Sequence, residues 1–459
     1  MDDALLSWCK RLIQCRSVTN EGTRTITELC ARELLAPNGI EARLLPSSQE
    51  GAGQVNLFAL IKGRDPTATP IVLNTHLDTV PPGDRAAWTE CASNPFAATL
   101  RDDRIYGLGA ADTKLDFAAK VFALARSGTP RHDTYLVGTF GEEHGLVGAK
   151  EMAQTGLLPR DALAFVGEPS RLEVITAHKG LMVFELTATF SPGRSSAASD
   201  AQRVVFAGRA AHSSTPALGR NAIRIALDAV IANPGVEVFA IDGGDAVNKV
   251  PARCEVIVAA ANPALANSGR VEPARIERGE TIPLSALAAI ARFLSALSDF
   301  TDRAGPPEPD YAAPTLTCNP GVIRSAPGSV ELEFELRPPP GLALDVVRRG
   351  VSGVVDAIAP PIPGIMLSLV ERRANPGFRS ALASETVELA MAAQASAGLP
   401  LTTNVKAGCT EAGIYAAAGM WPVVFGPGPS TGVIHAPNEY NLIGDVDGAL
   451  RFYLELLKA

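Results

Sequence analysis

Residues 70–83 read PIVLNTHLDTVPPG, an apolar run that ends in a histidine and an aspartate. His76 and Asp78 are two positions apart, which on a strand places both side chains on one face. Ligand-type residues follow apolar runs in other parts of the chain as well. These stretches are GLGAADTK (107–114), VGTFGEEHG (137–145), FVGEPS (165–170) and GPSTGVIHAPNE (428–439).

The apolar runs and the segments between them predict strands and helices in alternation. Strands are expected at 55–63, 70–78, 133–141 and 161–168, and helices at 114–128 and 145–156. This order favours an α/β fold, here a mixed twisted sheet with helices on both faces. Open α/β sheets place their sites at the carboxyl ends of strands, where the ligand-type residues fall.

The pattern changes after Gly180, and a chain of 459 residues is too long for one core. Alternating apolar residues at 180–190 and 203–212 predict a half-exposed antiparallel sheet. We therefore expect a smaller α+β domain with a small antiparallel sheet, inserted at 180–373. The catalytic domain is expected to comprise the flanking segments, 1–179 and 374–459.

Composition narrows the class of protein. Hydrophobic residues make up 46% of the chain, charged residues 20%, and the formal net charge is -8. These values are ordinary for a soluble protein and, without a basic stripe, argue against nucleic-acid binding. The start of the chain lacks the pattern of a secretory signal. No stretch approaches the ~18 to 20 apolar residues that a membrane span needs. The seven cysteines are scattered, which indicates reduced thiols. A cytoplasmic protein without membrane contact is expected.

The ligand-type residues have a plain and a functional interpretation. Alone, HLD is most often a strand end, EEHG a solvated helix start and GEP a turn. Together they offer two histidines and several acids, a set that binds a pair of zinc-like ions. Asp112 could bridge two ions, and one of Glu142 and Glu143 could bind metal while the other takes a proton from water. The residues alone thus favour a metal-dependent hydrolase.

The ordered motifs resemble the co-catalytic zinc metallopeptidases, which include acetylornithine deacetylase, succinyl-diaminopimelate desuccinylase, aminoacylase and glutamate carboxypeptidase. The resemblance extends over nearly the whole chain and implies a zinc-exopeptidase-like sheet. Its further motifs are AHKG (177–180), GRAAHSSTP (208–216), NKVP (248–251), an arginine before PPPG (338–341), CTEAG (409–413) and GPGPSTGVIHAPNE (426–439).

The resemblance implies two divalent metal ions, zinc first, with cobalt or manganese as alternatives. His76 and Glu168 would bind one ion, and Glu143 and His435 the other. Asp112 would bridge both ions, and its peptide bond to the next residue would be cis.

Further roles are implied by the same resemblance. Asp78 would orient His76, and Glu142 would be the general acid/base that moves a proton from the bridging water to the leaving amine. His212 would stabilise the oxyanion. Residues expected to hold the substrate are Asn248, Arg337, Thr410 and Glu411.

The leading hypothesis is an amidohydrolase that cleaves N-acyl amino acids and is most like acetylornithine deacetylase, with Glu411 facing a basic substrate tail. A dipeptidase or carboxypeptidase with the same site, acting on short peptides, is the alternative. A two-domain binding protein without activity is the alternative of another class.

Two departures from the family pattern bear on these expectations. The resemblance makes the 180–373 domain a lid or dimerisation domain; an extra insertion at about 261–313 enlarges it, and 191–200 extends a hairpin. In relatives an enlarged lid can replace the partner subunit of a homodimer. The segment KLDFAA (114–119) replaces the common K-G-G, a change expected to repack the helix start without touching a ligand.

Overall fold

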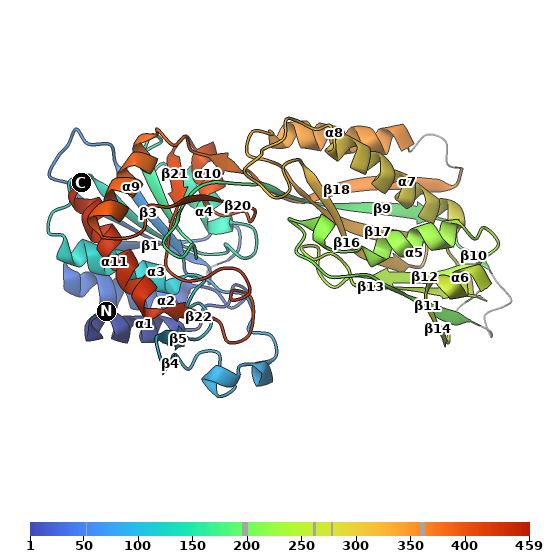
Figure 1. The fold of residues 1–459 in the computed structure, drawn as a ribbon, viewed down its shortest axis with the longest axis horizontal. Coiled ribbons are helices and arrows are strands. Elements are labelled where there is room, and N and C mark those ends of the chain that lie inside the picture. Colours follow the sequence, from blue (N-terminus) through green and yellow to red (C-terminus); the bar gives the residue numbers. More distant parts are fainter. Residues whose placement is uncertain (52, 195–200, 260–262, 277–278, 359–362) are drawn as a thin grey trace. The chain divides into compact units, whose positions relative to one another are not determined.

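The computed structural model describes residues 1–51, 53–194, 201–259, 263–276, 279–358 and 363–459 (Figure 1). These residues form two compact units. Unit 1 joins Met1–His178 to Phe378–Ala459, and unit 2 is Lys179–Gly377. Unit 1 is thus built from two segments that are separated in the sequence by the whole of unit 2.

Unit 1 contains a mixed sheet in the order β1-β2-β6-β3-β7-β21-β8-β19, with β20 paired to β8. Strand β3 runs parallel to β6 and β7, and β21 runs parallel to β7, whereas β1, β2 and β19 pair antiparallel. The strands are β1 (Ala42–Pro46), β2 (Val55–Ile61), β3 (Ile71–His76), β6 (Thr134–Thr139), β7 (Leu163–Gly167), β8 (Val174–His178), β19 (Phe378–Arg379), β20 (Thr403–Lys406) and β21 (Trp421–Val424).

Helices cover both faces of this sheet, as predicted. Successive strand residues point to opposite sides, so a strand that is apolar throughout needs a packing layer on each face. Leu73 of β3 belongs to a core with α1, α3, α9 and α11, whereas Val72 belongs to a second core with α4 and α10. The helices are α1 (Asp3–Gln14), α2 (Arg24–Leu29), α3 (Lys114–Arg126), α4 (Val147–Gln154), α9 (Glu385–Ser396), α10 (Ala412–Ala417) and α11 (Ile443–Lys458). A small sheet joins β4 (Thr99–Arg101), β5 (Arg104–Tyr106) and β22 (Tyr440–Leu442).

Unit 2 contains an antiparallel sheet of eight strands in the order β14-β11-β13-β12-β16-β17-β9-β18. Its core also takes in helices α5, α7 and α8. The strands are β9 (Leu181–Phe190), β11 (Gln202–Ala207), β12 (Val238–Gly243), β13 (Arg253–Val258), β14 (Arg270–Pro273), β16 (Thr317–Ala326), β17 (Ser329–Arg337) and β18 (Ile365–Asn375). The remaining elements are α5 (Ala222–Ile231), α6 (Pro263–Ser268), α7 (Leu284–Thr301), α8 (Leu344–Ile358) and a strand pair, β10 (Gly193–Arg194) and β15 (Glu280–Thr281).

Two expectations for unit 2 need correction. The strand predicted at 203–212 ends at Ala207, and His212 lies beyond it in an isolated antiparallel bridge with Lys249. Helix α7 has 18 residues and a mean hydropathy of 1.3, so by length and composition it could cross a membrane, contrary to the expectation that no segment would. Its buried residues, including Ile290 and Phe293, pack in the core of unit 2, which is typical of an internal helix. Residues 195–200, 261–262 and 277–278 of the two predicted insertions lie outside the described part of the chain.

Candidate metal centre

Three neighbouring strands end at the same edge of the unit 1 sheet and carry the predicted ligands there. His76 is the last residue of β3 and lies opposite Thr139 at the end of β6, just before Glu142. Glu168 directly follows β7, whose last residue lies opposite Thr75 of β3. Parallel pairing therefore brings together side chains that are far apart in the sequence.

Asp112 lies between the two histidines. Its Oδ1 is 3.1 Å from Nε2 of His76, and its Oδ2 is 3.1 Å from Nε2 of His435. Nε2 of His435 is also 3.1 Å from Oε1 of Glu143, and Nε2 of His76 is 3.8 Å from Oε1 of Glu168. One carboxylate thus presents a different oxygen to each of two imidazoles.

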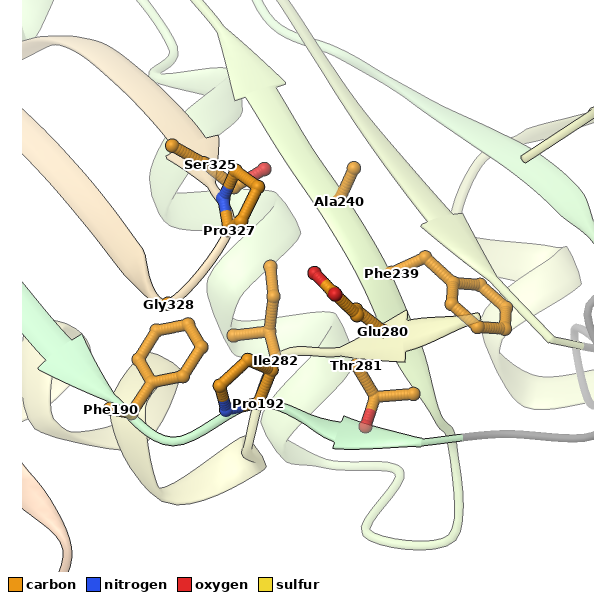
Figure 2. Close-up of a pocket in the computed structure, with 11 residues that line it drawn as sticks. Phe190, Pro192, Phe239, Ala240, Glu280, Thr281, Ile282, Ser325, Pro327 and Gly328 are labelled. Atoms are coloured by element: carbon orange, nitrogen blue, oxygen red, sulfur yellow. The ribbon is translucent and has the colours of Figure 1, made fainter. Parts of the chain in front are cut away.

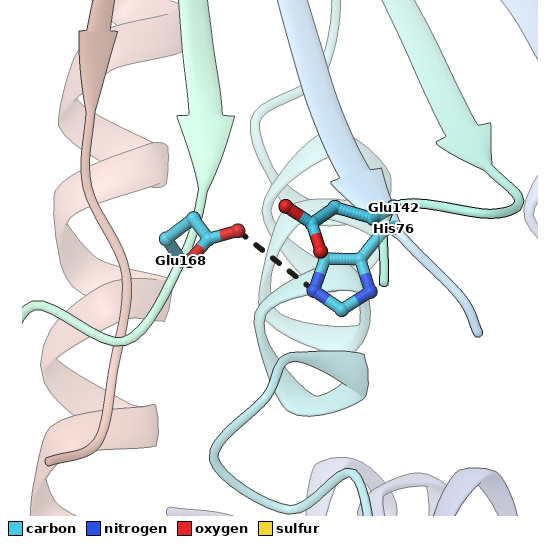
Figure 3. A group of neighbouring side chains, drawn as sticks. All are labelled: His76, Glu142 and Glu168. Carbon is cyan, nitrogen blue, oxygen red and sulfur yellow. Dashed lines mark ion pairs between the residues drawn. The ribbon is translucent and has the colours of Figure 1, made fainter. Parts of the chain in front are cut away.

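The donors form two groups that could each hold a metal ion. One is His76, Glu142 and Glu168 (Figure 3), and the other is Asp112, Glu143 and His435; within each group the donor atoms lie within 4.8 Å of one another. Tetrahedral zinc ligands at about 2.0 to 2.1 Å from the ion are about 3.3 Å apart. The imidazole–carboxylate separations in the centre, 3.1 to 3.8 Å, fit that spacing.

The carboxylates set the protonation of both imidazoles. Burial lowers the pKa of His76, but bonds to Asp112 and Asp78 outweigh it and the pKa lies well above the usual value. For His435 burial is likewise outweighed by Asp112 and Glu143, which raise the pKa to about 11. The same contacts hold the pKa of Asp112 well below its usual value despite burial.

The adjacent glutamates have the opposite tendency. Burial and the charge of Glu168 raise the pKa of Glu142 well above the usual value. Burial also raises the pKa of Glu143, although its hydrogen bond with His435 opposes this. An imidazole and a carboxyl with raised pKa values, side by side, form a centre where protons can be held and passed on.

Asp78 has more contacts than the predicted one. Its carboxylate Oδ1 is 3.6 Å from Nδ1 of His76, while its backbone oxygen is closer, at 3.1 Å. The same carboxylate accepts the backbone N–H groups of Glu142 at 3.2 Å and Glu143 at 3.4 Å, and the hydroxyl of Thr19 at 2.7 Å. Asp78 therefore fixes the glutamate pair as well as the histidine.

Two functional-site residues were missed from the sequence. Lys406 donates from Nζ to Oε2 of Glu168 at 2.8 Å. The other oxygen of that carboxylate, Oε1, is the one that faces His76. Glu439 is buried and accepts the backbone N–H groups of Ala111 and Asp112 at 2.9 and 3.0 Å. Glu439 belongs to the HAPNE motif, so the motif pointed to it, whereas nothing in the sequence pointed to Lys406.

The backbone is unusual at two of the predicted ligands. The peptide bond between Asp112 and Thr113 is cis, as the resemblance implied. His435 has a φ of 56°, in the left-handed region that a residue with a side chain rarely adopts. Left-handed backbone at a residue with a side chain clusters at working sites.

Thr410 and Glu411, predicted to face the substrate, are buried inside unit 1. Their exposed fractions are 0% and 1%. The backbone N–H of Thr410 donates to Nε2 of His178 at 3.2 Å, and Glu411 accepts the hydroxyl of Thr139 at 2.8 Å. This placement argues against the expected contact between Glu411 and a basic substrate tail.

The three predicted residues of unit 2 gather around Ser213. Its backbone N–H donates to the backbone oxygen of Asn248 at 3.1 Å, and its hydroxyl donates to Glu335 at 2.6 Å. Arg337 donates to the same oxygen of Glu335 at 2.5 Å. Next in sequence, Nδ1 of His212 accepts the backbone N–H of Ser214 at 3.1 Å, which places a proton on Nε2. Glu335 and Ser213 were not predicted.

Unit 2 also contains a separate cavity of about 440 Å³ (Figure 2). Aromatic and aliphatic side chains line it, together with the carboxylate of Glu280. None of the predicted site residues is among its lining residues, and it lacks the histidines of the centre in unit 1. The chemistry of the donors, not the size of a cavity, therefore identifies the candidate site.

The sequence profile of Peptidase family M20/M25/M40 matches residues 72–459. The chain belongs to this family. Among curated proteins, the acetylornithine deacetylase of Klebsiella pneumoniae (strain 342) is 34% identical over 221 residues, which cover 43% of this chain and 52% of that protein. The acetylornithine deacetylase of Photorhabdus laumondii is 33% identical over 240 residues, covering 48% and 55%. The chain thus matches these curated relatives over about half of their length.

Two solved structures share the fold over the whole chain. Aminoacylhistidine dipeptidase from Vibrio alginolyticus has a TM-score of 0.69 at 17% identity and is covered to 96%, with 100% of this chain aligned. A metallo-carboxypeptidase from Sulfolobus solfataricus has a TM-score of 0.60 at 18% identity, with coverage of 100% and 99%. These likenesses confirm the predicted fold class, a mixed α/β sheet with a separate antiparallel sheet.

Proposed function

We propose that this M20 family chain is a metal-dependent amidohydrolase that cleaves the amide of an N-acyl amino acid, most like acetylornithine deacetylase. The observation that carries the proposal is the position of Asp112, with one oxygen 3.1 Å from each of two histidines. A carboxylate that faces two imidazoles in this way suits a pair of ions. The match to two acetylornithine deacetylases supports the choice of substrate class.

In this proposal the residues hold two divalent ions, zinc first, with cobalt or manganese also accepted by such donors. His76 and Glu168 would hold one ion, Glu143 and His435 would hold the other, and Asp112 would serve both. The ions would polarise the amide carbonyl and lower the pKa of the attacking water.

Glu142 is proposed as the general acid/base. It is 9% exposed and lies beside His76 and Glu168 (Figure 3), and its raised pKa suits a group that accepts and returns a proton. Glu142 takes a proton from the attacking water as the new carbon–oxygen bond forms. It then delivers that proton to the amide nitrogen as the carbon–nitrogen bond breaks, which yields a carboxylic acid and an amine.

The parts played by unit 2 rest on the family resemblance and on contacts within that unit. With Nδ1 engaged by Ser214, His212 can donate from Nε2 to a developing oxyanion. Arg337, with Asn248 nearby in the cluster around Ser213, suits the carboxylate of an amino acid because a guanidinium binds carboxylates through two hydrogen bonds.

The test is hydrolysis by zinc- or cobalt-loaded protein of N-acetylornithine, N-acetylmethionine, N-succinyl-diaminopimelate and several dipeptides. We expect turnover of an acetylated amino acid and a loss of about 10²-fold or more in kcat for Glu142→Gln. Glu151→Gln, on α4 and hydrogen bonded to Ser47 and Ser48, is the control and should keep full activity. Cleavage of dipeptides alone would move the protein to the peptidases of the family. Full activity of Glu142→Gln would refute its role.

A further inference from the structure

A charged pair is buried beneath the metal centre, on the first turns of α3. Nζ of Lys120 is 2.7 Å from Oδ2 of Asp116, one helical turn away, and both side chains are 0% exposed. Asp116 belongs to the segment KLDFAA, where the chain departs from the K-G-G pattern that the resemblance implies. The KLDFAA segment was expected not to touch a ligand; its aspartate lies against the residues that precede two of them, Thr75 and Gly167.

Lys120 links the two strands that end in ligands. Its ammonium donates to the backbone oxygen of Asn74 at 2.5 Å and to the hydroxyl of Thr75 at 2.9 Å, both on β3. It also donates to the backbone oxygen of Phe165 on β7 at 3.3 Å. Asn74 and Thr75 immediately precede His76, so one ammonium fixes the end of β3 against its neighbour β7.

Asp116 completes the link on the carboxylate side. Its Oδ2 accepts the hydroxyl of Thr75 at 2.6 Å, and its Oδ1 accepts the hydroxyl of Tyr453 at 2.6 Å. A Cβ on Gly167, the residue before Glu168, would lie 2.0 Å from Oδ2 of Asp116. The carboxylate therefore packs directly against the backbone of β7 where that strand delivers Glu168.

The energetics argue that this pair serves geometry. Burying two charges costs several kcal/mol per ion, and apolar residues of similar volume often stabilise a fold as well or better. Here each charge is fully hydrogen bonded to the strand ends or to Tyr453, which is the condition for a rigid buried network. A network of this kind holds neighbouring residues in one arrangement.

We propose that Asp116 and Lys120 are positioning residues that hold His76 and Glu168 at the separation required to share one metal ion. The proposal rests on the proposed function, since it assumes that the centre binds two ions. It makes one of the two ions depend on a charge pair that contacts neither ion.

The experiment measures zinc affinity by competition with a chromophoric chelator, together with thermal unfolding of the metal-free protein. In Asp116→Asn/Lys120→Met both charges are removed at nearly constant volume. We expect the dissociation constant of one ion to rise by about tenfold or more, an effect typical of residues that support metal ligands. The dissociation constant of the other ion should rise by less than about threefold. The control is Asp447→Asn/Arg451→Met, an ion pair with the same spacing on α11, which should leave both constants unchanged.

A second variant covers the case in which the double variant fails to fold. Thr75→Val keeps the shape of the side chain and removes the hydroxyl that bonds to both Asp116 and Lys120, while the bond from Lys120 to the backbone of Asn74 stays. It should weaken the same ion with little change in the melting temperature. Unchanged affinities in the folded variants, or equal weakening of both ions, would overturn the proposal. If the wild-type protein binds fewer than two ions, the proposed function fails instead.

Discussion

Removing one charge of the Asp116–Lys120 pair should lower the free energy of unfolding more than removing both charges. Lys120→Met leaves the buried carboxylate of Asp116 without its cation, so we expect a loss of about 3 to 5 kcal/mol in the free energy of unfolding. Asp116→Asn/Lys120→Met removes both charges and should be more stable than the single variant. Urea denaturation of metal-free protein measures both. A double variant less stable than Lys120→Met would contradict the reasoning.

Strand β7 packs closely against helix α3 at Gly167, so the two elements cannot move independently there. Gly167→Ala would place a methyl group 2.0 Å from a carboxylate oxygen of Asp116, which is held by Lys120, Thr75 and Tyr453. Either β7 or α3 must shift, and overpacking of this kind costs about 1 to 3 kcal/mol.

The measurement for Gly167→Ala is again urea denaturation, with zinc affinity as the second readout. Gly53→Ala is the control, because a Cβ on Gly53 would have no atom within 4 Å. Its stability should change by less than about 0.5 kcal/mol. A neutral Gly167→Ala variant would show that the strand end tolerates movement.

The elements also show what the sequence could predict. Strands β3, β6 and β7 were predictable because each is a short apolar run bounded by turn residues. Strand β16 was missed because Pro320 and Gly321 interrupt its pattern; the structure accommodates them at a bulge opposite β17. At the centre, the residues expected as ligands do gather, and their roles as ligands stay predictions. The contacts of Lys406 and Asp116 were not predicted because several of their partners are distant in sequence, and such contacts leave no local pattern.

The acidic centre makes the stability of the whole molecule depend on pH when no metal is bound. Burial raises the pKa of Glu411 to about 7 and that of Glu439 to about 8, and the pKa of His435 is raised to about 11. In each case the folded state holds a proton that the unfolded state releases at lower pH. The stability these protons support is fully present below the unfolded pKa values and is lost as pH rises through the folded ones.

We therefore expect the melting temperature of chelator-treated protein to fall steadily between about pH 5 and pH 8. Glu411→Gln should flatten part of this slope, because a neutral amide has no proton to lose. Differential scanning calorimetry at several pH values gives the comparison. A melting temperature that rises over this range would mean that other groups dominate the linkage.

Unit 1 is completed only after unit 2 has been made. The segment that carries His76, Asp112, Glu143 and Glu168 precedes Lys179, and the segment that carries His435 follows Gly377. During synthesis the edge of β7 therefore stays unpaired until β21 has been made, about 240 residues after the end of β8. The last predicted ligand and the last strands of unit 1 are synthesised together, so the centre and the domain are completed in one late step of folding.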